Sequence, residues 1–304
     1  MVYEEAASQE LKFAQGTVTA VVLGIMQDGG LPHAGCRCER CVAAFRDPTK
    51  IKYTASLGIV DNRTSTSPAA VYLIDATPDI KFQLNLLADA LGAHPQRPHR
   101  LRQPDAIFLT HAHMGHIGGL PQLGPESMAV SRLPVYASAP LGQLLQSTPV
   151  WQPLVENLRI VPLQPGQYVD LALDIQVTAV PVPHRDEWGV GTFAYKIQGA
   201  KHSLLYVPDI DSWEAWPEAE EMLSSVDIAL VDASFYSQDE LNGRSSIAHP
   251  LVTDTLQMKQ KFNCELILTH LNHTNPILDS TSSAYAQVLK SGITLAYQGQ
   301  QIQL

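Results

Sequence analysis

Hydrophobic residues along this chain are arranged in short runs that follow two different spacings. Continuous apolar runs rich in β-branched residues predict buried strands, and apolar residues that recur every three or four positions predict helices. The predicted strands are 17–25, 67–79 (ending in a turn), 105–110, 133–138, two within 167–183, a hairpin of 191–199 and 202–211, 227–235, 264–272 and a closing hairpin in 294–304. The predicted helices are 80–91, 139–147, 251–262 and 281–292, the last with Gly292 as its C-terminal cap. Residues 27–41 and 98–106 are predicted to be loops.

The order of these elements indicates the fold class. Strands and helices alternate, and both halves of the chain contain strand-rich runs, which is typical of α/β and α+β proteins. A chain of 304 residues is long enough to bury a large core. We therefore expect a single domain with two sheets over residues 17–304, preceded by an N-terminal extension over residues 1–16.

Composition and charge narrow the class of protein further. Of the 304 residues, 45% are hydrophobic and 16% are charged, as in globular chains. The net charge is −10 and Lys and Arg do not cluster, so we expect no nucleic-acid partner. No apolar run reaches the length of a spanning helix, about 18 residues, and the acidic start lacks the features of a signal peptide. These observations predict a cytoplasmic protein with no membrane partner.

Three histidines lie close together directly after the predicted strand 105–110. His111, His113 and His116 occupy positions i, i+2 and i+5. On a regular helix or strand these side chains would diverge, so they converge only on a loop that turns into a helix near His116. Imidazole is a common ligand of zinc, iron and manganese. The spacing therefore predicts a metal site at the end of this strand.

A second cluster of metal-binding side chains lies in the predicted loop 27–41. Cys36, Cys38 and Cys41 are too close in sequence to be good disulfide partners. Three thiolates in a glycine-flanked loop instead provide three of the four ligands of a tetrahedral structural zinc. The residues alone leave the fourth ligand open, and His33 is the nearest histidine along the chain. The fourth cysteine, Cys264, is predicted to be a buried core thiol.

The segment LTHAHMGHIGGL, residues 109–120, resembles the HxHxDH signature of the metallo-β-lactamase superfamily. The resemblance implies an α/β (α+β) fold, an αββα sandwich of two mixed β-sheets flanked by helices. It also implies that His111 and His113 bind a first metal ion and that His116 binds a second. Gly115 stands where the signature has aspartate, so one carboxylate of the second site is missing and we expect one or two ions.

The same resemblance assigns ligands further along the chain, each at the end of a predicted strand. They are His184 in VPVPHRDEWG, Asp209 in LLYVPDID and His270 in LILTHLNH. Asp211 lies close to Asp209 in sequence and competes with it for the bridging position. Ends of neighbouring strands meet at one edge of a sheet, which is where α/β proteins build their sites.

The cysteine cluster resembles that of metallo-β-lactamase-fold phosphodiesterases of the PhnP kind. These proteins pair a CxCxxC with a histidine three residues beyond the last active-site histidine. The resemblance therefore implies a structural Zn²⁺ site made of Cys36, Cys38, Cys41 and His273.

Longer segments resemble the PqqB family, the pyrroloquinoline quinone biosynthesis proteins B. They include LGIMQDGGLPHAGCRCERC, IDATPDIKFQL, VPDIDSW, GRSSIAHP and THLNHTNPILD, and the resemblance runs from about residue 18 to the C-terminus. Many members of that family have a degraded histidine cluster, whereas this chain keeps His111 and His113.

These resemblances imply three alternative functions. The PqqB family implies oxidative processing of a Glu-Tyr-derived precursor, for which histidines and one carboxylate around Fe²⁺ are suited. The phosphodiesterases imply metal-dependent hydrolysis, with Asp209 orienting the water and His249 acting as an acid near the leaving group. The third function is that of a non-catalytic quinone carrier. We expect Zn²⁺, Mn²⁺ or Fe²⁺ in the active site and a small-molecule or short peptide-derived substrate, and a homodimer is left open.

Overall fold

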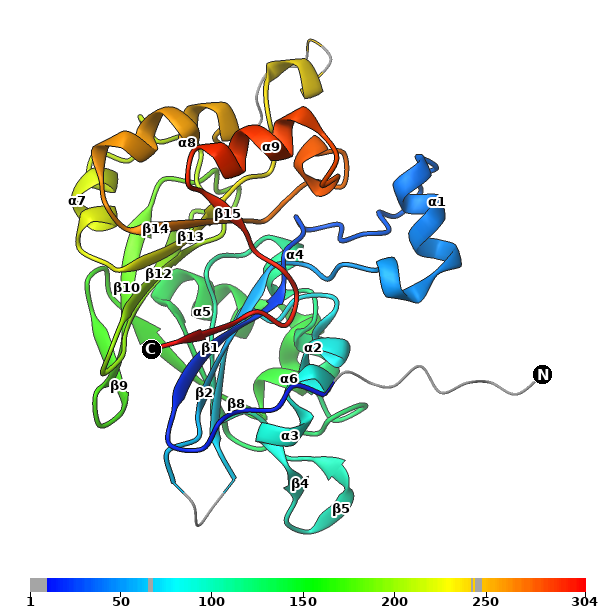
Figure 1. Cartoon of the computed structure of the whole chain (residues 1–304). Coiled ribbons are helices and arrows are strands. Elements are labelled where there is room, and N and C mark those ends of the chain that lie inside the picture. Colours follow the sequence, from blue (N-terminus) through cyan, green and yellow to red (C-terminus); the bar gives the residue numbers. More distant parts are fainter. Residues whose placement is uncertain (1–9, 65–67, 242, 244–247) are drawn as a thin grey trace.

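The chain folds around two mixed β-sheets that pack face to face (Figure 1). The structure is a computed structural model that describes residues 10–64, 68–241, 243 and 248–304. The first sheet contains β1 (Val18–Gly24), β2 (Ser56–Asp61), β3 (Ala70–Ile74), β6 (Ala106–Phe108), β7 (Leu133–Ser138), β8 (Leu158–Leu163) and β16 (Gln301–Gln303). The second sheet contains β9 (Tyr168–Ala172), β10 (Ile175–Val182), β11 (Thr192–Gln198), β12 (Ser203–Val207), β13 (Ile228–Asp232), β14 (Glu265–Thr269) and β15 (Thr294–Leu295).

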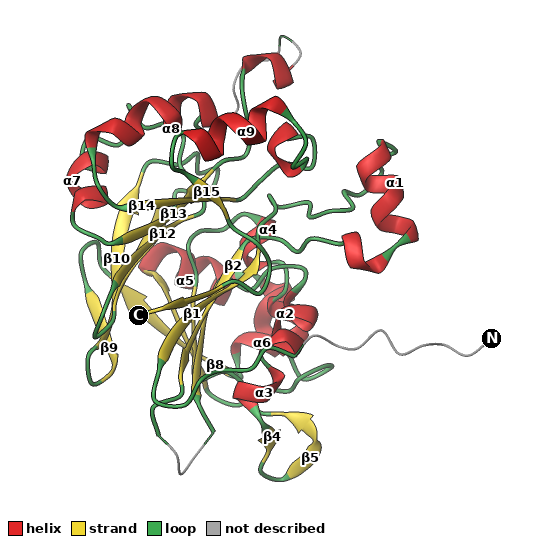
Figure 2. Cartoon of the chain, in the orientation of Figure 1, coloured by secondary structure: helices red, strands yellow, loops and turns green. Residues whose placement is uncertain are grey.

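Helices cover the outer faces of both sheets (Figure 2). The α-helices are α1 (Glu39–Arg46), α2 (Ile80–Leu86), α3 (Ala88–Leu91), α4 (Met114–Ile117), α5 (Ala139–Ser147), α6 (Gln152–Val155), α7 (Ala219–Ser224), α8 (Val252–Met258) and α9 (Ser283–Lys290). Short 3₁₀ turns lie at Pro48–Lys50, Leu120–Leu123, Pro149–Trp151, Gln238–Leu241, Lys259–Lys261 and Pro276–Leu278. Helices α7, α8 and α9 lie over the second sheet, and α2, α3 and α6 lie beside the first (Figure 2). The predicted αββα sandwich is therefore confirmed.

The two sheets share one pattern of strand pairing. In the first sheet, neighbours are antiparallel from β16 through β1 and β2 to β3, and parallel from β3 through β6 and β7 to β8. In the second sheet, neighbours are antiparallel from β9 to β12 and parallel from β12 to β15. In both sheets the parallel strands bring their C-terminal ends to the same edge, where connecting loops can meet.

Strand β1 shows how the sequence supports both layers at once. All seven of its residues are buried, and successive side chains point to opposite faces. Ala20 and Val22 belong to the core between the sheets, whereas Val21 and Leu23 belong to the core between the first sheet and its helices. Phe13 joins this second core, so residues just before the strand also pack onto the sheet. Residues 1–9 of the predicted N-terminal extension lie outside the described residues.

Several element boundaries follow from capping residues. The Ser138 side chain accepts from the backbone N–H of Leu141 at the start of α5, and Ser282 accepts from Tyr285 at the start of α9. Gly292 follows α9 with φ 77°, the left-handed conformation that ends helices, as predicted.

Three local predictions differ from the structure. The predicted helix 80–91 is interrupted at Leu87, between α2 and α3. The predicted loop 98–106 contains most of β5 (Arg97–Leu101), which forms a small hairpin with β4 (Ala93–His94). The predicted closing hairpin is wrong, because β15 pairs with β14 in the second sheet while β16 pairs with β1 in the first. Among the described residues, no helix is long and apolar enough to cross a membrane.

Candidate metal centre

The predicted site residues come together where strands of the two sheets end. His111, His113 and His116 follow β6, and His184 follows β10. Asp209 follows β12, and His270 follows β14. All six side chains are buried, with exposed fractions between 0% and 9%. The structure therefore brings together every active-site ligand that the resemblance implied.

The histidine loop adopts the conformation expected from its spacing. Strand β6 ends at Phe108, His113 lies in extended conformation directly before α4, and His116 lies within that short helix. The second sheet holds the loop from across the core, because the Tyr195 hydroxyl donates to the Leu109 carbonyl at 2.6 Å. The histidines thus lie on a strand-to-helix loop that is anchored to both sheets.

The first donor cluster contains His111, His113 and His184. Nε2 of His111 lies 2.9 Å from Nδ1 of His113, and Nε2 of His184 lies 3.3 Å from the same Nδ1 atom. Each residue offers one nitrogen, and the three nitrogens lie within 4.8 Å of one another. Burial and the neighbouring His116 hold the pKa of His111 well below its usual value, so its ring is neutral, the form that binds metal ions.

The second donor cluster lies on the other side of Asp209. Oδ2 of Asp209 is 2.9 Å from Nε2 of His116 and 3.4 Å from Nε2 of His270. The same carboxylate also reaches the first cluster, 3.9 Å from Nε2 of His111 and 3.8 Å from Nε2 of His184. Asp209 is therefore the bridging candidate. Asp211 instead accepts from the backbone of Arg185 and lies 3.3 Å from Nδ1 of His184.

These separations fit a bound metal ion. Ligands about 2.0–2.2 Å from a tetrahedral ion lie about 3.3–3.6 Å from one another, and the donor pairs across the two clusters lie 2.9–3.9 Å apart. Within the described part of the chain, Nε2 of His116, Nε2 of His270 and Oδ2 of Asp209 are buried and make no well-aligned hydrogen bond, although His116 Nε2 and Asp209 Oδ2 lie 2.9 Å apart. Such atoms are costly unless something else satisfies them, and a metal ion would do so.

Each candidate histidine ligand is also contacted on its other ring nitrogen. These contacts are His111 Nδ1 with Thr110 Oγ1 at 2.9 Å, His113 Nε2 with Glu187 at 2.9 Å, His116 Nδ1 with Asp75 at 2.6 Å, His184 Nδ1 with Asp211 at 3.3 Å and His270 Nδ1 with Ser234 Oγ at 3.0 Å. Hydrogen-bonded partners of this kind fix ring orientation and tautomer in metal sites. Nδ1 of His184 is the exception, because it makes no hydrogen bond within the described residues. Burial lowers the pKa of His116, but the carboxylates of Asp75 and Asp209 outweigh it and raise that pKa well above its usual value.

His249 stands beside the two clusters, and its ring has donor atoms of Asp209, Asp232 and His270 within 4.8 Å. Its Nδ1 lies 2.7 Å from Asp232 and 3.6 Å from Asp209, and its Nε2 lies 3.1 Å from the side-chain amide of Gln27. Burial lowers the pKa of His249, but Asp232 and then Asp209 outweigh it and raise the pKa to about 9. Residues 244–247, which precede it in GRSSIAHP, lie outside the described residues.

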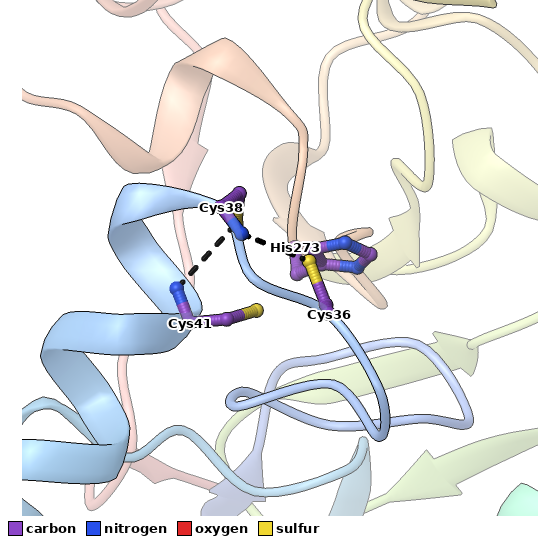
Figure 3. Close-up of side chains that lie close together, drawn as sticks. All are labelled: Cys36, Cys38, Cys41 and His273. Carbon is purple, nitrogen blue, oxygen red and sulfur yellow. Dashed lines mark hydrogen bonds between the residues drawn. The ribbon is translucent and has the colours of Figure 1, made fainter.

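The cysteine cluster forms a third group of donors (Figure 3). The thiols of Cys36, Cys38 and Cys41 and one ring nitrogen of His273 lie within 4.8 Å of one another. Backbone N–H groups point at the sulfurs: that of Cys38 lies 3.4 Å from Cys36 Sγ, and that of Cys41 lies 3.5 Å from Cys38 Sγ. Burial raises the pKa of the Cys38 thiol, but the N–H donors of Cys41 and Arg40 and the neighbouring thiols outweigh it and lower that pKa. These features suit thiolates that bind a metal ion.

The structure separates the two candidates for the fourth ligand. His273 belongs to the thiol cluster, and its Nδ1 is buried without a hydrogen-bond partner among the described residues. His33 instead packs against His273, with ring centroids 4.5 Å apart and the ring planes tilted by 33°. The Arg40 guanidinium donates to the carbonyl of His273 and ties α1 to the segment after β14. His273 lies three residues after His270, so one short segment serves both the thiol cluster and the active-site clusters.

Three carboxylates of the site were not found by reasoning from the sequence. Asp75 and Asp232 stand at the C-terminal ends of β3 and β13, the same kind of position as Asp209, which the family resemblance had assigned. Asp75 has φ 69°, a conformation that non-glycine residues adopt mainly at strained functional positions. The third, Asp28, lies in the loop after β1, with Oδ1 3.4 Å from Nε2 of His116. No pattern in the sequence links it to the histidines.

Comparison with protein families agrees with this geometry. The model of the beta-lactamase superfamily domain matches residues 71–271, about two thirds of the chain. The chain belongs to the beta-lactamase superfamily. Membership in this superfamily accounts for the sandwich, and with the donor clusters it indicates a metal-binding protein.

Within the superfamily, the chain is similar to PqqB proteins along nearly all of its length. It is 26% identical to coenzyme PQQ synthesis protein B of Methylococcus capsulatus, covering 93% of this chain and 99% of that protein. It is 28% identical to the Cupriavidus necator protein of the same name, covering 93% and 98%. The predicted resemblance to the PqqB family is thus confirmed.

Solved structures show the same fold. Zn²⁺-bound PqqB from Methylobacterium extorquens superposes with a TM-score of 0.78 at 20% identity, covering 94% of this chain and all (100%) of that one. A diphosphatase from the PhnP family superposes with a TM-score of 0.68 at 23% identity, covering 94% and 97%. Proteins that share this fold therefore include both a PqqB and a diphosphatase.

Proposed function

We propose that this protein is a metal-dependent hydrolase that cleaves phosphodiester-like bonds at the site around Asp209. The observation that carries the proposal is the position of Asp209, which lies between the two donor clusters and within 4 Å of histidines in both. A carboxylate shared in this way is expected of a site that holds two ions. When bound, such ions polarise the scissile group and lower the pKa of a bound water to near 7.

The residues around the ions have separate tasks in this proposal. His111, His113 and His184 hold one ion, and His116 and His270 take part in holding the other. The burial of these side chains keeps bulk water from competing for them. Asp209 would face both ions and orient the attacking water.

His249 is the proposed general acid. Asp232 fixes its Nδ1 at 2.7 Å and so leaves Nε2 as the nitrogen that can face a substrate. As the water oxygen bonds to phosphorus and the water loses a proton to solvent, the bond to the leaving oxygen breaks and that oxygen takes the proton from Nε2. His249 then regains a proton from solvent. The side-chain amide of Gln27 lies 3.1 Å from the same Nε2.

The thiol cluster has a structural role in the proposal. Cys36, Cys38, Cys41 and His273 bind one Zn²⁺ in a closed four-ligand site, with no position left for substrate. The zinc fixes the loop after β1 to the segment after β14. Residues 17–304 act as one domain, and the cytoplasmic location stays a prediction.

The test begins with protein stripped by chelator and reloaded with Zn²⁺, or with Zn²⁺ followed by Mn²⁺. We expect hydrolysis of bis(p-nitrophenyl) phosphate only by the reloaded protein, and loss of both metal and activity in His111→Ala. His249→Gln should keep its metal content and lose about 10²- to 10⁴-fold in kcat. That loss should be larger for an alkyl leaving group than for p-nitrophenolate, because only the alkoxide needs the proton. Loaded protein that cleaves no phosphodiester would overturn the proposal.

Oxidative processing of a Glu-Tyr-derived precursor is the second candidate. It is favoured by the similarity to PqqB proteins over 93% of the chain. This candidate predicts O₂ consumption by the Fe²⁺-loaded protein in the presence of a tyrosyl peptide, with no phosphodiester cleavage. Tight binding of a quinone without turnover of either substrate would instead indicate a carrier.

A further inference from the structure

Gly115 occupies a position where the structure has no room for a side chain. A Cβ placed on it would lie 2.1 Å from Oδ1 and 2.6 Å from Cα of Asp28, far inside van der Waals contact. Gly115 lies within α4, outside the left-handed region of φ, so its backbone conformation does not require glycine. The constraint on Gly115 is therefore the space that Asp28 occupies.

The carboxylate in this space faces the second donor cluster. Oδ1 of Asp28 lies 3.4 Å from Nε2 of His116 and 3.8 Å from Nε2 of His270. Both nitrogens belong to side chains that are at most 1% exposed, and neither has a hydrogen-bond partner among the described residues. The three donor atoms lie within 4.8 Å of one another. Separations of this size match the spacing of about 3.3–3.6 Å between ligands of one tetrahedral ion.

The backbone holds Asp28 firmly at this place. The preceding residue, Gln27, donates from its N–H to the carbonyl of Leu271 at 2.9 Å, directly after His270. Its carbonyl accepts from the N–H of Gly30 at 2.8 Å, which closes a tight turn around Asp28. The turn is therefore tied to the same segment that supplies His270.

We propose that Asp28 is a ligand of the second metal ion and replaces the carboxylate that Gly115 lacks. The carboxylate comes from the loop after β1 instead of from α4, and the glycine at 115 is the condition for its approach. The second cluster then contains Asp28, His116, Asp209 and His270, a complete set of donors. This inference rests on the proposed metal-dependent function and adds the residue that allows two ions.

The test measures metal content and does not depend on turnover. Full-length protein is stripped, reloaded with Zn²⁺ to fill the thiol site and then titrated with Mn²⁺. Electron paramagnetic resonance distinguishes a spin-coupled Mn²⁺ pair from a single ion. We expect a coupled pair in the wild type and a single ion in Asp28→Asn, which keeps the shape of the side chain. Loss of a residue that contacts a metal ligand typically lowers metal affinity by roughly 10- to 100-fold. Asp28→Asn removes a ligand itself, so the affinity for the second ion should fall by more than this.

Two further variants separate the explanations. Gly115→Ala should also lose the coupled pair, because its methyl group displaces the Asp28 carboxylate. Asp89→Asn is the matched control, since its side chain is 38% exposed against 40% for Asp28 and it lies in α3, paired with Lys12 and outside the donor clusters. This control should keep the pair.

Different results would overturn the role of Asp28 and the proposed function. A coupled pair that persists in Asp28→Asn but is lost in His116→Ala would overturn the role of Asp28 and leave the second site intact. A wild-type protein that binds no Mn²⁺ beyond its zinc would overturn the proposed function itself.

Discussion

Replacing Asp75 by asparagine should weaken binding of the second ion without altering the fold. The Asp75 carboxylate is fully buried and accepts from the Thr110 N–H at 2.8 Å, the Thr110 hydroxyl at 3.0 Å and His116 Nδ1 at 2.6 Å. An asparagine that keeps the bond to the Thr110 N–H must present its NH₂ group to His116. The proton of His116 is then driven from Nδ1 to Nε2, the nitrogen that would bind the ion.

The size of the effect follows from this geometry. In the opposite orientation the NH₂ group of the asparagine faces the Thr110 N–H, so two donors oppose each other. An unpaired buried donor costs about 1–3 kcal/mol. Loss of an outer partner of a ligating histidine typically costs about 10- to 100-fold in metal affinity, or about 1.4–2.7 kcal/mol. The two estimates agree, so we expect the dissociation constant of the second ion to rise by one to two orders of magnitude, roughly.

The assay is a competition titration against a chromophoric chelator, with circular dichroism to check the fold. Asp227→Asn is the control, because Asp227 also accepts from a backbone N–H and a hydroxyl, both of Ser203, at 2.7 and 2.8 Å. Equal affinities for the second ion in Asp75→Asn and Asp227→Asn would refute the reasoning.

Three further predictions concern the scaffold. Cys36→Ser/Cys38→Ser should lose one zinc per chain by elemental analysis, whereas Cys264→Ser, in the buried core, should keep it. Tyr195→Phe leaves the Leu109 carbonyl without its 2.6 Å donor and should destabilise the fold by about 1–3 kcal/mol, seen as a lower urea midpoint at unchanged m-value. Chelator treatment should lower the melting temperature, and Zn²⁺ alone should restore part of the loss; an unchanged melt would count against a structural zinc.

Much of the site could be located from the sequence because its members are marked locally. The spacing of His111 and His116 is visible within one short segment, and the superfamily resemblance assigned Asp209 and His270 at the ends of apolar strands. The ligand roles of these residues stay proposals, but their convergence is seen in the structure. The position of Asp28 could not be found in this way, because it depends on how the loop after β1 approaches α4.

The errors in the fold have a similar origin. The residues of β15 and β16 form two strand-like runs that are close in sequence, so a hairpin was predicted. The local pattern of apolar and polar residues does not determine which sheet each strand joins. The exposed strand β5 contains Arg97, Pro98, His99 and Arg100, so it lacks the apolar residues that identify buried strands. Pairing with a distant edge and exposure to solvent are both decided by tertiary structure.

The thiol cluster and the active-site clusters are joined by two short stretches of chain, one from Asp28 to Cys36 and one from His270 to His273. A protein without zinc holds both stretches only by weaker contacts, such as those of Arg40 and His33 with His273. Asp28 and His270 are then the least well positioned donors of the second cluster. Zinc should therefore enter first and the second active-site ion last. In a cell short of zinc, newly made chains would accumulate in an inactive form even where the catalytic metal is plentiful, and zinc supply would set how much working protein is present.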